Sequence, residues 1–172
     1  MKPFFVFAAV FITSSSIAQS SLDALIQDFE RNKAMCISYV EAMPENQFDF
    51  KPTPDVRSFA EQFLHISQGL VGLASNGTGS ERIFGTENLE QNDSYKTKQE
   101  VLRILSESFD HVISSVGAMD PATFDEIIQR GQFNVSRIGW VNKALEHSTH
   151  HKGQAAVYLR MNGIQPAQFQ LF

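Results

Sequence analysis

Cysteine is almost absent from this sequence of 172 residues, since Cys36 is the only one. A single cysteine cannot form a disulfide within the chain, so the fold must be held by core packing or by a bound metal. Cys36 lies in the apolar stretch KAMCISYV. In such a stretch, a free cysteine is most often a small buried side chain. We therefore interpret Cys36 as structural and not as a nucleophile.

Clusters of like charge are also absent. The chain has 14 basic and 19 acidic residues, a net charge of −5, and no run of one sign. A surface that binds nucleic acid needs clustered cations to displace the counterions of the phosphates. The acidic balance therefore argues against nucleic acid as a partner.

The N-terminus has an apolar run, Phe4–Ile12, that is far too short to span a bilayer, which takes roughly 20 apolar residues. Lys2 precedes the run, and small and polar residues follow it, with Ser16 and Ala18 placed three residues and one residue before a cleavage point. This order is typical of a secretory signal peptide and disfavours an uncleaved anchor. We predict a signal peptide over residues 1–18. The mature protein would then be exported, periplasmic or secreted in a bacterium, without a membrane span.

Residues 19–172 suit one domain that is large enough to bury a core. Loss of Lys2 with the signal peptide leaves 13 basic and 19 acidic residues, a net charge of −6. Apolar residues recur at steps of three and four in four segments, which predicts four helices. Their approximate ranges are 21–43, 58–75, 96–116 and 138–161.

Local signals support these boundaries. Pro44 stops the first helix, and Ser58 with Glu61 forms a capping box at the start of the second. Residues 77–93 are rich in glycine, asparagine and threonine and predict a loop, while residues 125–139 predict a loop with at most short extended stretches. Four helices of about 20 residues, each roughly 30 Å long, favour an all-α antiparallel four-helix bundle. Because the connections are not all short, the topology need not be a simple up-and-down one.

Two of the five histidines, His147 and His151, lie four residues apart in the last predicted helix. Side chains at that spacing share one face, so both imidazoles can point at one ion about 2.0–2.1 Å away if it is zinc. His150 points roughly 60° away from that line and is predicted to be a surface or supporting residue. A pair of this kind also occurs on solvated helices, so a metal site needs a third ligand from elsewhere.

His65, in the second predicted helix, is the candidate for that third ligand. A lone histidine in an apolar context is usually a hydrogen-bonded core residue. However, Glu61, His65 and Gln68 share one polar face, and unpaired polar groups are costly to bury. A metal shared with the last helix would give His65 a partner. His111 lies beside Asp110 without a paired ligand and is predicted to be an ordinary surface residue.

Two segments resemble a known family, the DinB/YfiT-like metalloenzymes of the DinB superfamily. MPENQFDFKPTPDVRSFAEQFLHI is similar to that family's linker and second helix, where RSF precedes a ligand histidine. EHSTHHKGQAAVYLRMNGIQP is similar to its last helix, where a histidine pair precedes Gly-Gln and YLR. The resemblance implies that His65, His147 and His151 are metal ligands. It also implies a bundle with a long crossover connection, and a homodimer.

Three neutral imidazoles would leave a divalent ion with its full charge and with open positions, as in catalytic zinc sites. Zinc and nickel both suit imidazole, and the ligand set does not exclude copper or iron. A bound water could then hydrolyse an ester or amide, or a bound thiol could become a nucleophile. Family members with assigned activities resemble the second case, as transferases or isomerases that use a small cellular thiol. Export disfavours that case, because small thiols belong chiefly to the reducing cytoplasm.

The small-molecule substrate is unknown, and a non-catalytic role is the alternative. In that role the ion fastens the second helix to the last, in an exported binding or stress-response module. A large apolar pocket above the metal, lined by Trp140, Tyr158 and phenylalanines, would favour catalysis or ligand binding. Near the candidate ligands, Glu61, Glu146 and Lys143 are predicted to be solvated or supporting residues, so no catalytic acid or base is assigned.

Overall fold

The computed structural model describes the backbone of residues 7–172 and the side chains of residues 20–172. The predicted signal peptide therefore lies outside the described side chains, and its first six residues lie outside the described backbone. Four helices dominate the described chain: α1 (Phe7–Ala42), α2 (Phe59–Thr78), α3 (Lys98–Gly117) and α4 (Arg137–Met161). Helix α1 begins at Phe7, well before the predicted start near residue 21. Its first turns therefore fall within the segment that the sequence predicts to be a signal peptide. Within the described residues, no helix has the length and apolar character needed to cross a bilayer.

The helix boundaries follow the local signals of the sequence. The Ser58 hydroxyl accepts a hydrogen bond from the Glu61 backbone N–H, and the Glu61 carboxylate accepts one from the Ser58 backbone N–H. This reciprocal pair is the predicted capping box. Helix α2 ends at Gly79, whose φ of 78° is a left-handed conformation that glycine adopts without strain. The Ser136 hydroxyl likewise caps α4 by accepting from the Gly139 N–H.

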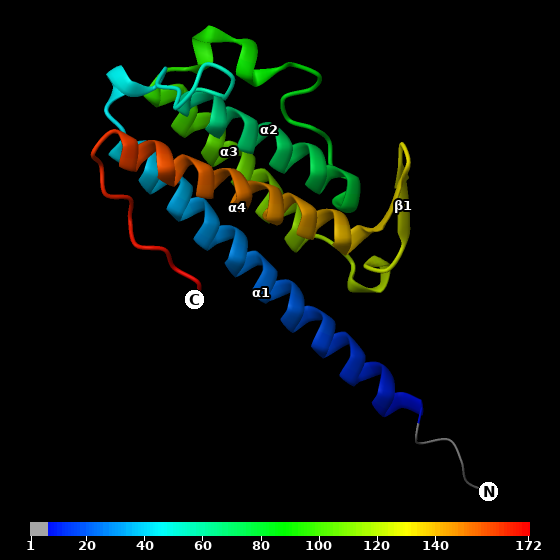
Figure 1. The fold of residues 1–172 in the computed structure, drawn as a ribbon. Coiled ribbons are helices and arrows are strands. Elements are labelled where there is room, and N and C mark those ends of the chain that lie inside the picture. The colour runs from blue at the N-terminus through cyan, green and yellow to red at the C-terminus, as the bar shows by residue number, and fades with distance from the viewer. Residues whose placement is uncertain (1–6) are drawn as a thin grey trace, which may run out of the picture.

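The four helices form one bundle, which confirms the predicted fold class (Figure 1). Helices α1 and α2 each pack against both α3 and α4. The pairs α1–α3 and α2–α4 run antiparallel, whereas α2–α3 and α1–α4 run parallel (Figure 1). A parallel α2–α3 pair requires the chain to return along the bundle. Residues 79–97 make this crossover and include two short 3-10 helices, η2 (Leu89–Gln91) and η3 (Asp93–Tyr95).

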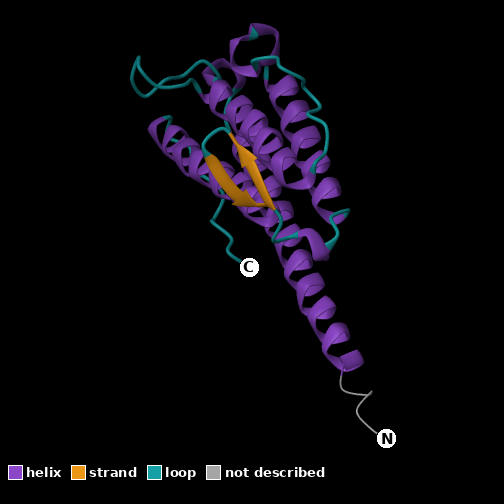
Figure 2. Cartoon of the chain, turned by 90° about the vertical axis from the view of Figure 1, so that its right-hand side faces the viewer, coloured by secondary structure: helices purple, strands orange, loops and turns teal. Residues whose placement is uncertain are grey.

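The chain segment that connects α3 to α4 contains a two-stranded hairpin, formed by β1 (Ile127–Arg130) and β2 (Phe133–Ser136) (Figure 2). The sequence predicted only short extended stretches here, and the structure shows that they pair in antiparallel register. The turn uses Gly131, with φ at 58°, where a side chain would be strained. The Trp140 indole N–H donates to the Ile128 carbonyl oxygen at 3.2 Å, which ties the hairpin to α4.

The core between the helices is apolar and close-packed. Its fully buried side chains include Phe29, Phe59, Phe63 and Phe109. Cys36 lies among them, and burial raises the pKa of its thiol to about 12. A thiol that stays protonated is a poor nucleophile, so the structural interpretation of Cys36 is supported.

Candidate metal centre

Three histidines meet between α2 and α4. His65 comes from α2, and His147 and His151 come from successive turns of the antiparallel α4. One ring nitrogen from each lies within 4.8 Å of the other two, so the group could hold a metal ion. Nε2 of His65 and Nε2 of His147 are 3.1 Å apart. The structure thus brings together the three histidines that the sequence singled out.

The spacing of these nitrogens fits a shared ion. Two nitrogens bound at about 2.0–2.1 Å, with an angle between about 90° and 110° at the ion, lie roughly 2.9–3.4 Å apart. The 3.1 Å separation of the His65 and His147 nitrogens falls in that range. Without an ion, the N–H of one ring would have to donate a hydrogen bond to the nitrogen of the other.

The electrostatic setting keeps two of the rings neutral. Burial, followed by the neighbouring His65 and His150 rings, lowers the pKa of His147 to about 4. Burial, followed by the His65 and His147 rings, lowers the pKa of His151 to about 4. Both imidazoles are therefore neutral near pH 7, with one ring nitrogen of each carrying no proton. A metal ligand needs that state, because the ion binds the nitrogen lone pair.

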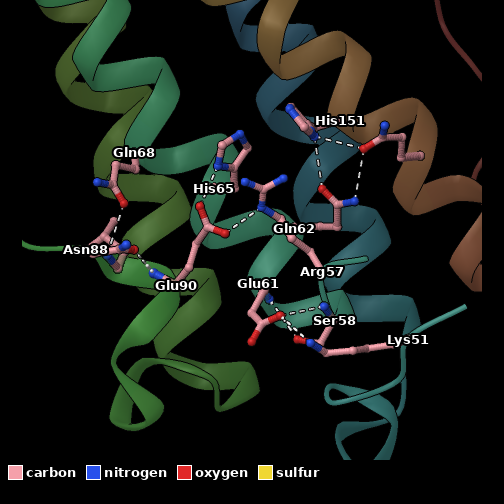
Figure 3. Close-up of polar contacts among 12 residues, drawn as sticks. Lys51, Arg57, Ser58, Glu61, Gln62, His65, Gln68, Asn88, Glu90 and His151 are labelled. Atoms are coloured by element: carbon pink, nitrogen blue, oxygen red, sulfur yellow. Dashed lines mark hydrogen bonds and ion pairs between the residues drawn. The ribbon is translucent and has the colours of Figure 1, made fainter. Parts of the chain in front are cut away.

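A carboxylate orients His65. Nδ1 of His65 lies 2.6 Å from Oε1 of Glu90, and Oε2 of the same carboxylate accepts from Nε of Arg57 at 2.5 Å. Figure 3 shows the Glu90 side chain between the two. A carboxylate on the outer nitrogen favours a proton there, which leaves the Nε2 lone pair directed at the site.

The segment that carries Glu90 is fastened to α2. The Gln68 side chain accepts from the Leu89 backbone N–H at 3.1 Å and donates to the Glu87 carbonyl oxygen at 3.2 Å. The Asn88 side chain caps η2 by accepting from the Glu90 N–H. The crossover is thus held against the helix that supplies His65, and Glu90 is positioned as a result.

Amide oxygens orient His151. Its Nδ1 lies 3.1 Å from Oε1 of Gln62 and 3.0 Å from Oε1 of Gln154. Both partners are acceptors, so Nδ1 carries the proton and Nε2 is free for an ion. Gln62 is itself buried and donates to the Tyr158 hydroxyl, which donates to the Arg57 carbonyl oxygen. Tyr158 therefore supports the site by holding Gln62 in place.

His147 packs directly against the backbone of α2. A Cβ placed on Gly69 would lie 2.1 Å from Cε1 and 2.6 Å from Nδ1 of His147. Only glycine lets the ring come so close. Nδ1 of His147 is buried and, among the described residues, has no hydrogen-bond partner. This ring is thus placed by packing, whereas the other two are placed by hydrogen bonds.

A cavity of about 650 Å³ opens beside His147, with His150 also on its wall. Its apolar lining consists of Leu73, Phe133, Val135 and Trp140. The volume lies within the range of small-molecule sites, which is roughly 300–1,000 Å³. Of the residues named for a pocket that would favour catalysis or ligand binding, Trp140 and one phenylalanine line this cavity and Tyr158 does not.

The other polar candidates each have a partner outside the three histidines. His150 is exposed and contacts the Gln154 amide, and His111 contacts a backbone carbonyl in the crossover. Glu61 caps α2 and pairs with two lysines, while Glu146 pairs with Lys143 at 2.5 Å. These contacts leave no catalytic acid or base assigned.

Sequence reasoning missed most of the groups that orient the histidines. Gln154 lies three residues from His151, so helical spacing does carry a signal for it. Gln62 contacts His151 from the other helix, and no local pattern marks that contact. Glu90 comes from the loop that the sequence interprets as a plain connection, and no local pattern marks it. Gly69 also has no local signal, because its role depends on a ring from another helix.

Comparisons with known proteins agree with this fold. The model of the DinB superfamily matches residues 28–155. A DinB-like protein from Bacillus cereus has a TM-score of 0.73 at 12% identity, over 86% of this chain and 97% of that one. A DinB-like protein from Bacillus subtilis has a TM-score of 0.69 at 18% identity, over 85% and 96%. No protein with a curated function matches the sequence. At these identities the solved structures show the shared fold alone.

Proposed function

The chain belongs to the DinB superfamily, and from that premise we propose that it binds one divalent metal ion, zinc or nickel, through His65, His147 and His151. The observation that carries the proposal is the convergence of three ring nitrogens within 4.8 Å. The outer nitrogens of His65 and His151 are held by a carboxylate and by two amides. Imidazole ligands suit both metals.

We propose further that the site is catalytic, in a metal-dependent hydrolase acting on a small ester or amide. A bound ion would supply Lewis acidity and would acidify a water or thiol ligand. The chain supplies orientation: Glu90 fixes the ring of His65, and Gln62 and Gln154 fix that of His151. All three proposed ligands are uncharged, so they would not neutralise the ion.

Access to the site supports catalysis over a purely structural metal. The His65 side chain is 23% exposed, and the cavity of about 650 Å³ borders His147. A closed structural site would leave neither opening. We also propose that the protein is exported and forms a homodimer. Export favours hydrolysis over thiol transfer, because small thiols are chiefly cytoplasmic.

Metal analysis of the purified protein tests the ligand set. We expect one ion per chain in the wild type and in His111→Ala, and loss of the ion in His151→Ala. Equal metal content in all three proteins would show that the assignment is wrong.

Activity assays then separate the possible roles. The metal-loaded protein would be tested against esters, against amides, and against a thiol with an electrophile. Hydrolysis that disappears on chelation is the expected result. Turnover only with the thiol would identify a transferase. No activity in any of these assays, together with a loss of thermal stability on chelation, would identify a structural metal.

A further inference from the structure

The cavity beside His147 has an apolar wall built from three elements. Leu73 comes from α2, Phe133 and Val135 from β2, and Trp140 from α4. The Phe133 side chain is 56% exposed although it is large and apolar, whereas Trp140 is only 6% exposed. The indole N–H already has its partner in the Ile128 carbonyl. The wall is therefore aromatic and apolar, and its one indole N–H is already hydrogen-bonded. Such a wall suits the apolar body of a ligand.

The same cavity holds one cation without a counter-charge. Its charged lining residues are Arg130, Lys143 and Glu146. Lys143 and Glu146 pair with each other at 2.5 Å. Arg130 takes part in none of the ion pairs found in the described part of the chain. Its Nε donates to Oδ1 of Asn76 at 3.1 Å and its Nη1 to a backbone carbonyl at 3.3 Å. These two hydrogen bonds hold the guanidinium in place. Because both acceptors are neutral, they do not neutralise its charge, which remains available to an anion.

The hairpin places these two features side by side. Arg130 and Phe133 are direct cross-strand partners, on either side of the turn at Gly131. One short element thus presents both a cation and an aromatic ring at the cavity that ends at His147.

We infer that this cavity binds a small amphiphilic anion, with an aromatic or branched apolar body against Phe133 and Trp140 and a carboxylate or sulfonate at Arg130. The inference rests on the proposed function in one respect only, the identification of this ligand as the substrate. The substrate would then be an ester or amide of an apolar molecule that also carries an acidic group. Binding to the cavity itself requires only the hairpin, α2 and α4.

The single tryptophan makes this inference testable. Trp140 is the only one in the chain. Energy transfer from it to a naphthalene probe therefore reports that the probe is bound, and variants of the cavity residues then show where it is bound. Anilinonaphthalene sulfonate carries the apolar body and an anion, and phenylnaphthylamine carries the same rings without the charge. We expect both to bind the full-length protein and to quench Trp140 emission, the sulfonate more tightly.

Two variants separate the charge from the apolar contact. Arg130→Gln should weaken sulfonate binding about fivefold, the effect of roughly 1 kcal/mol, and leave the neutral probe unchanged. Phe133→Ser should weaken both probes alike. Arg82→Gln and Phe169→Ser are matched controls, since Arg82 also lacks a described ion pair and Phe169 is 53% exposed. Both controls should bind as the wild type does.

Several outcomes would overturn the inference. They are no binding of either probe, an equal effect of Arg130→Gln on both probes, or no effect of that change on either. The titrations would be repeated on chelated protein and on His151→Ala. Probe binding that persists while metal is absent from every preparation would refute the metal proposal and leave the cavity inference standing. Metal binding with no probe binding would refute the cavity inference and leave the metal proposal standing.

Discussion

The contact between Gly69 of α2 and the His147 ring gives a sharp test of how His147 is placed. In Gly69→Ala the new methyl group would lie 2.1 Å from Cε1 of His147. Carbon atoms in ordinary contact are about 3.5–4.0 Å apart, so the ring must move by roughly 1.5 Å. Metal sites tolerate errors of only about 0.2 Å in ligand distance. The ring would therefore leave the position from which it can share an ion with the other two histidines.

Gly72→Ala is the matched control, because a Cβ there has nothing within 4 Å. Both changes replace a glycine inside α2, and alanine favours a helix by about 0.5–1 kcal/mol. Gly72→Ala should show this gain in full as a higher free energy of unfolding, with metal affinity unchanged. In Gly69→Ala the strain on His147, about 0.5–1.5 kcal/mol for a displaced rotamer, should offset it.

The assay combines thermal melts of the metal-free proteins with competitive metal titration. We expect Gly69→Ala to melt near the wild type and to bind metal at least about tenfold more weakly, as for other disturbances of ligand orientation. If the variant folds and binds metal as tightly as Gly72→Ala does, the argument that His147 is a ligand placed by packing is refuted.

Three further predictions concern charged groups. Glu90→Gln should weaken metal binding about 10- to 100-fold, with Glu87→Gln unchanged in the same titration, because only Glu90 contacts His65. Partial burial opposes ionisation of Glu61, but the Ser58 N–H and the lysine ion pairs outweigh it and lower its pKa to about 2. Its stabilisation is complete above its ordinary pKa of 4.5 and is lost as pH falls towards 2, so Glu61→Gln should flatten that decline in acid melts. Burial lowers the pKa of Lys152, which is 6% exposed and has no described ion pair. Lys152→Met should therefore raise the melting temperature at neutral pH, and a fall would contradict this reasoning.

Much of the scaffold can be predicted from the sequence, because its signals are local. The Ser58 capping box, Pro44 and the glycine after α2 fix helix ends through hydrogen bonds or dihedral limits within a few residues. The spacing of His147 and His151 likewise places them on one face of a helix whatever surrounds it.

What the sequence does not reveal depends on contacts between distant segments. Glu90 reaches His65 only because the parallel α2–α3 pair sends the crossover back along the bundle. The hairpin that carries Arg130 and Phe133 forms from stretches too short to predict a pairing. Tyr158 shares the helix face of the ligands, yet its hydroxyl supports Gln62 and does not line the cavity. The spacing of residues in a helix predicts the direction in which each side chain points. What that side chain contacts depends on tertiary packing.

X-ray absorption at the zinc edge of the zinc-loaded full-length protein tests the central claim most directly. The structure predicts three imidazole nitrogens at about 2.0–2.1 Å in the first shell of the ion, with lighter atoms completing it. The Gly69→Ala and His65→Ala proteins should each lose an imidazole from that shell. A wild-type spectrum with fewer than three imidazoles, or with sulfur at about 2.3 Å, would contradict the account.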